Sequence, residues 1–91
     1  MNFLKLNNID HVWANICKHE GEVFHTVRNI EYTYVVKDNC ILINNDVRRK
    51  IKKVAIEKAL SIENPTPYKI QMANIWGPSY IYGIITDSRI I

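Results

Sequence analysis

The sequence predicts an α+β fold, in which a three-stranded antiparallel sheet has three to four helices packed on one face. Apolar residues recur with helical spacing near the N-terminus and after residue 46, and three stretches rich in β-branched and aromatic residues lie between them. The length of 91 residues and the apolar content of 47% are typical of one globular domain, so we expect a single domain over residues 1–91.

The first helix is predicted over residues 9–17. Its apolar residues have the spacing of an amphipathic helix: Ile9, Val12, Trp13, Ile16 and Cys17. Asn7 or Asn8 is suited to cap its N-terminus.

Three strands are predicted to follow as an antiparallel meander, over residues 22–27, 31–36 and 40–44. Arg28, Asn29 and Ile30 form the first turn. Asp38 and Asn39 occupy the second turn, because both residue types tolerate the left-handed backbone of tight hairpins.

A helix capped by Asn45 or Asp46 is predicted to run to Leu60. Pro65 and Pro67 then indicate an extended connector over residues 61–69. A short helix over 70–76 would end at Gly77, and Pro78 is suited to begin the last helix.

Five of the twelve basic residues fall within six positions: Arg48, Arg49, Lys50, Lys52 and Lys53. Without these five charges the formal charge falls from +3 to −2, so the chain is a near-neutral domain with one concentrated positive site. In the first turns of a helix these cations would add to the positive end of the helix dipole and favour a phosphate there. The cluster therefore predicts a non-catalytic nucleic-acid-binding protein, with DNA favoured over RNA as its partner.

The remaining polar residues suggest how such a protein would contact DNA. Arg49, Lys50 and Lys53 would contact phosphate, whereas Asn44, Asn45 or Arg48 would read base edges. Arg28 at the first turn would serve as the wing of a winged-helix-like module, a fold-level analogy. Tyr32 and Tyr34 share one strand face, and Trp76, Tyr80 and Tyr82 cluster near the C-terminus. Such aromatic residues would stack on unpaired bases if exposed, although tyrosines at strand spacing are usually half-buried.

The sequence offers little support for catalysis or for a metal or other cofactor. Cys17, His19 and His11 lack the paired short spacings of a zinc site, and two cysteines make no disulfide framework. No set of acids and bases has a catalytic spacing. We expect no enzyme activity, no cofactor and no metal.

The segment GPSYIYGIITDSRI at residues 77–90 resembles the ending of small uncharacterised domains of low-GC bacteria and their phages. Residues 54–60 share the resemblance more faintly. Some of these domains accompany DNA-processing or defence proteins, so the resemblance implies a role near DNA, including a phage or prophage anti-defence role. Asp87 and Arg89 within this segment are predicted to form a local ion pair.

Two other interpretations of the basic cluster stay open. The cluster is a solvated face that serves solubility, or this chain is a small phage or mobile-element protein that docks on a host protein through the cluster and inhibits it. A homodimer through the tyrosine-rich strands belongs to this second interpretation. No apolar run approaches the roughly 20 residues of a membrane span, so we expect a cytoplasmic protein without a membrane partner.

Overall fold

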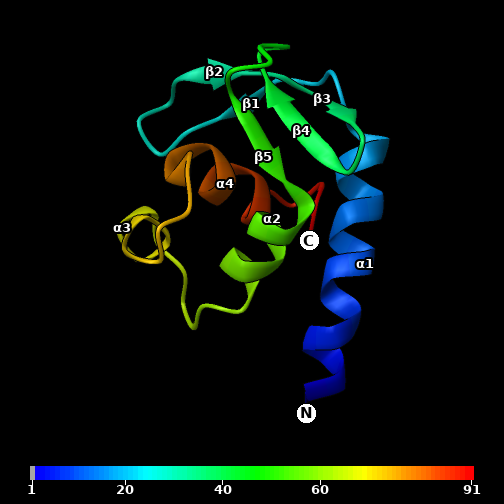
Figure 1. Cartoon of the computed structure of the whole chain (residues 1–91), viewed down its shortest axis with the longest axis vertical. Coiled ribbons are helices and arrows are strands. Elements are labelled where there is room, and N and C mark those ends of the chain that lie inside the picture. The colour runs from blue at the N-terminus through cyan, green and yellow to red at the C-terminus, as the bar shows by residue number, and fades with distance from the viewer. Residues whose placement is uncertain (1) are drawn as a thin grey trace.

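The computed structural model describes the backbone of residues 2–91 and the side chains of residues 9–91. In Figure 1 the helices lie below and beside the strands. The elements follow one another as α1 (Asn2–Lys18), β1 (Phe24–His25), β2 (Glu31–Tyr32), β3 (Tyr34–Lys37), β4 (Cys40–Ile43), β5 (Lys50–Lys52), α2 (Lys53–Leu60), α3 (Pro67–Met72) and α4 (Pro78–Ile85).

The α+β class and the three-stranded antiparallel sheet are confirmed, but the strands are not those predicted. The sheet has the order β3-β4-β5, while β1 and β2 form a separate two-stranded ribbon. The meander breaks at Thr33, whose N–H donates to Asn44 Oδ1 rather than to a neighbouring strand. The third strand is therefore β5, which contains part of the basic cluster.

The helix predicted to begin at Asn45 or Asp46 begins at Lys53 instead, so that prediction was wrong. Asn44 and Asn45 have φ angles of 54° and 55°, the left-handed conformation that Asn tolerates better than most residues. They turn the chain back after β4, and Asp46 accepts the Arg48 N–H at 2.9 Å in the next turn. The chain then returns beside β4 as a strand.

The other elements agree with the prediction in type and differ in their ends. Helix α1 extends back to Asn2, because no Gly or Pro interrupts residues 2–8, and Asn7 and Asn8 therefore lie within it. The predicted connector includes the start of α3, where Thr66 Oγ1 accepts the Lys69 N–H. Asp38 and Asn39 form the expected tight turn between β3 and β4, and Pro78 begins α4 as predicted.

Two buried tyrosines tie the strands to the helices. Tyr34 is fully buried and its hydroxyl donates to the Ile16 carbonyl of α1 at 2.6 Å. Tyr32 is 2% exposed and its hydroxyl donates to the Tyr80 carbonyl of α4 at 2.8 Å. Burial raises the pKa of both phenols above the usual range. Neither ring is available for stacking on a ligand or for a dimer contact.

Arg89 connects the C-terminal turn to the residues at the start of β1. The predicted ion pair with Asp87 is present at 2.9 Å, and Arg89 also pairs with Glu22 at 3.0 Å. Its guanidinium lies 3.9 Å from the centroid of the Phe24 ring, and it donates to the Val23 carbonyl. One side chain thus joins the end of the chain to the start of β1.

Gly83 should be intolerant of a side chain. A Cβ atom there would lie 2.6 Å from the His25 carbonyl oxygen and 2.7 Å from Tyr32 Oη. Gly83→Ala should lower the free energy of unfolding by about 1–3 kcal/mol through overpacking. This is opposite to the gain of about 1 kcal/mol that Ala normally brings to a helix. Urea unfolding measures it, with Ser79→Ala as the exposed control on α4, and a stabilised Gly83→Ala would contradict the packing.

Stability should fall in acid through the Arg89 cluster. Hydrogen bonding by Arg89 lowers the pKa of Asp87, and hydrogen bonds from His19 and then Arg89 lower that of Glu22. The pKa values of Asp87 and Glu22 in the folded protein therefore lie below their ordinary values of about 3.9 and 4.3. The stabilisation by these two carboxylates is complete above about pH 5 and is lost as the pH falls through their folded-state pKa values. Urea unfolding across pH 5 to 2 should show a shallower decline for Arg89→Gln than for wild type. Parallel declines would show that Arg89 does not set these values.

Candidate nucleic-acid interface

Strand β5 divides the basic cluster between two faces of the sheet. Ile51 is 2% exposed and pairs with Ile41, which is fully buried in the core. Because side chains alternate along a strand, Lys50 and Lys52 lie on the opposite face, and both are exposed. Arg49 lies on the helical side of the sheet, where it contacts Tyr80.

A third lysine shares the outer face. In the register of the sheet, Lys37 of β3 lies opposite Cys40, and Cys40 lies opposite Lys52. Lys37 was not among the predicted site residues, although counting outward from the Asp38 turn would have paired it with Cys40. We call Lys37, Lys50 and Lys52 the basic face.

An apolar floor lies between two lysines of the basic face, Lys37 and Lys50. Leu42 is 5% exposed, and with Lys37, Asp38, Val47 and Lys50 it lines a hollow of about 210 Å³. Lysine can lay its methylene stem along such a surface and keep its ammonium group in water. Leu42 therefore gives the lysine stems a surface to pack on.

No lysine of the basic face forms an ion pair within the described part of the chain, although two carboxylates lie nearby. Asp38 and Glu57 line a second hollow with Lys52, outside ion-pair distance. The three ammonium groups are thus available to an external anion.

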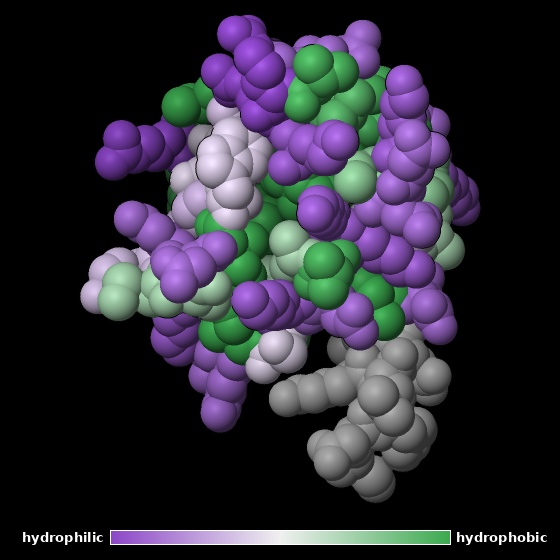
Figure 2. Space-filling model, viewed as in Figure 1, coloured by the Kyte–Doolittle hydropathy of each residue, from purple (hydrophilic) through white to green (hydrophobic). Residues whose placement is uncertain are grey.

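The two arginines of the cluster have partners inside the protein. Arg48 Nη2 lies 3.2 Å from Asp46 Oδ2, and this hydrogen bonding holds the pKa of Asp46 below its usual range. Arg49 lies 3.7 Å from the same carboxylate and donates to Tyr80 Oη at 2.9 Å. Hydrophilic side chains crowd the top of the molecule in Figure 2, where the loop between β4 and β5 lies. Asp46 therefore offsets part of the positive charge of this loop.

The basic cluster does not fill the first turns of a helix as predicted. Only Lys53 of the cluster lies in the first turn of α2, and its ammonium group is 5.7 Å from the centroid of the Trp13 ring. Lys52 is the N-cap residue of α2, whereas Arg48, Arg49 and Lys50 precede the helix in the loop and on β5. The helix that a winged layout would need for DNA contact therefore does not carry the cluster.

The other two predicted contact residues lie apart from the basic face. Asn45 is exposed in the loop between β4 and β5. Arg28 lies in the β1–β2 turn and lines a groove with Tyr80, the residue that Arg49 contacts. The structure thus brings Lys50 and Lys52 together with Lys37, and links Arg28 to the cluster only through Tyr80.

Comparison with protein-family models, curated proteins and solved structures finds no significant match. The resemblance of residues 77–90 to phage and bacterial domains stays a prediction. Within residues 2–91, no helix is both long enough and apolar enough to cross a membrane.

Proposed function

We propose that the protein binds nucleic acid without catalysis, through phosphate contacts of the basic face. The observation that carries the proposal is the placement of Lys37, Lys50 and Lys52 on one exposed sheet face, without an ion-pair partner among the described residues. Nucleic acid is the polyanion whose binding such a patch most often serves.

The spacing of the lysines suits a chain of phosphates. Alternate residues of a strand are about 6.6–6.8 Å apart, and strands two positions apart are separated by about 9.5 Å. Duplex DNA carries one negative charge per about 1.7 Å of its axis, so three lysines at these spacings can meet three phosphates. The strands fix the lysine Cα atoms, and the flexible stems adjust the ammonium groups.

Backbone donors support the same contact. Ile43 N–H donates to the Arg49 carbonyl, and Lys53 N–H donates to the Asn39 carbonyl. In an antiparallel pair this pattern directs the N–H groups of Lys50 and Lys52 away from β4, toward the open edge of the sheet. Backbone N–H groups are common phosphate ligands in DNA complexes.

The proposed binding is independent of base sequence. Two of the candidate base readers have other partners, because Asn44 Oδ1 accepts the Thr33 N–H and Arg48 pairs with Asp46. Phosphate contacts alone set affinity and orientation but do not discriminate between bases.

Salt dependence tests the proposal. For three phosphate contacts with duplex DNA, log affinity should fall against log salt with a slope of about −2.7, because each contact contributes about −0.9. Lys50→Ala/Lys52→Ala should reduce the slope to about −1 and weaken binding at low salt. Fluorescence anisotropy with a labelled 12-base-pair duplex measures both quantities.

Lys18→Ala/Lys58→Ala removes the same charge from exposed positions on α1 and α2 and is the matched control. It should keep the wild-type slope. Equal slopes for the two double variants, or no binding by wild type at low salt, would refute the proposal. That result would favour lysines that serve solubility and protect the edge strand from pairing.

Protein binding is a second candidate function, favoured by a different surface. Tyr68 and Met72 lie one turn apart on α3 and are 68% and 65% exposed. Exposed apolar side chains at this spacing are typical of helices that dock on a partner. An inhibitor of a host protein would use this face of α3 rather than the buried Tyr32 and Tyr34.

A further inference from the structure

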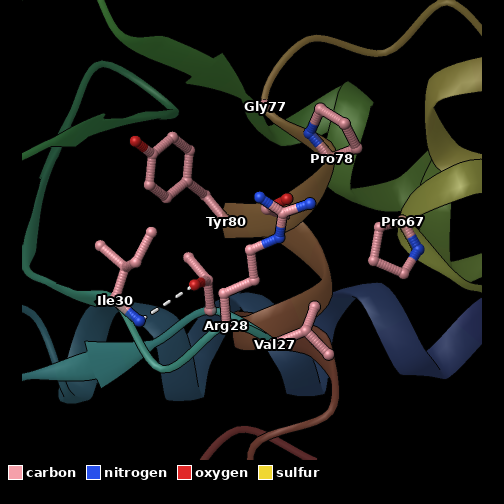
Figure 3. A pocket seen from close by; sticks show the side chains of 9 residues that line it. Val27, Arg28, Ile30, Pro67, Gly77, Pro78 and Tyr80 are labelled. Atoms are coloured by element: carbon pink, nitrogen blue, oxygen red, sulfur yellow. Dashed lines mark hydrogen bonds between the residues drawn. The ribbon is translucent and has the colours of Figure 1, made fainter.

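A groove separates the β1–β2 turn from the start of α4. Its volume is about 470 Å³, within the range of sites that hold small organic groups. Figure 3 shows Ile30 and Val27 on the turn side, with Pro67 and Pro78 across from them. The described lining residues are 26–28, Ile30, Pro67 and 77–80.

The lining combines apolar surface with positive charge. Val27 and Ile30 are 64% and 57% exposed, so much of their apolar surface remains uncovered. Arg28 is the charged residue among those that line the groove, and no carboxylate of the described chain pairs with it. Its complement is a ligand with a flat apolar part and an anionic part.

Tyr80 connects this groove to the basic loop. Arg49 donates to its hydroxyl at 2.9 Å, and Arg28 lines the same groove as Tyr80. The ring is held by Tyr32, which meets it edge-on with centroids 5.0 Å apart. Because Tyr80 is already fixed by these contacts, little side-chain entropy would be lost when a ligand binds.

Trp76 extends the aromatic surface beside the groove. Its ring centroid is 6.2 Å from that of Tyr80, and the side chain is 52% exposed. Single-strand-binding proteins combine exposed aromatic rings, which stack on bases, with cations that hold phosphates, and Trp76 supplies such a ring here.

We infer that this groove and Trp76 bind an unpaired base of single-stranded nucleic acid, with the adjoining phosphates held by Arg28 and Arg49. The inference rests on the proposed function and names its preferred ligand. In a duplex the faces of the bases are stacked inside the helix, so only an unpaired base can stack on Trp76 or enter the groove. The basic face then serves both forms of nucleic acid, and the groove serves the single strand.

The test compares a labelled 12-nucleotide oligothymidylate with the 12-base-pair duplex by fluorescence anisotropy. Trp76→Ala should weaken binding of the single strand about tenfold and change duplex affinity less than twofold. Trp76→Phe should restore most of the loss, because it keeps an aromatic ring. Arg28→Gln should weaken the single strand selectively as well. Tyr68→Ala removes another exposed aromatic side chain, on α3 and outside the groove lining; it is the control and should leave both affinities unchanged.

The outcomes separate this inference from the proposed function. Loss of both ligands in Lys50→Ala/Lys52→Ala, together with selective loss of the single strand in Trp76→Ala, supports both. Three results would overturn the inference about the groove without contradicting the basic face. Trp76→Ala could affect both ligands equally, it could affect neither, or Tyr68→Ala could cause an equal loss. Failure of wild type to bind either ligand overturns both.

Discussion

The pairing of Ile51 with Ile41 is the constraint on which the candidate interface depends. Both side chains are buried in the core, so the register of β5 cannot slip by one residue without exposing Ile51 and burying a lysine. Burying an unpaired ammonium group costs far more than burying an apolar side chain gains. The same hydrophobic contact that completes the sheet therefore orients Lys50 and Lys52 toward solvent.

Several features could be predicted because their signals are local. Asp38 and Asn39 in a two-residue turn, Pro78 at a helix start, and Asp87 two residues from Arg89 each act through neighbours in the chain. The α+β class followed from the same local signals.

The place of the basic cluster could not be predicted by the same means. Residues 53–60 do form a helix. The sequence-based prediction continues this helix without a break back through the basic cluster. The contrary signals were Asn44-Asn45, which resembles the Asp38-Asn39 turn, and the alternation of Lys50, Ile51 and Lys52. Three residues are too few for a periodicity to be decisive, and it is the long-range contact with Ile41 that settles the strand.

The fold places the cations of the cluster in different surroundings. Arg48 and Arg49 contact Asp46, whereas the lysines of the basic face have no such partner among the described residues. Sequence analysis could not separate them, because all five residues look alike in a count of charge. Arg28 and Tyr80 were brought to one groove only by the packing of the β1–β2 ribbon against α4.

A titration of ¹⁵N-labelled protein with the 12-base-pair duplex, followed by amide chemical shifts, tests most directly the claim that register creates the interface. The largest shifts should fall on Lys37, Lys50 and Lys52, while Ile41 and Ile51, turned to the core, change less. Shifts concentrated on residues 53–60 instead, or none on β5, would contradict the account.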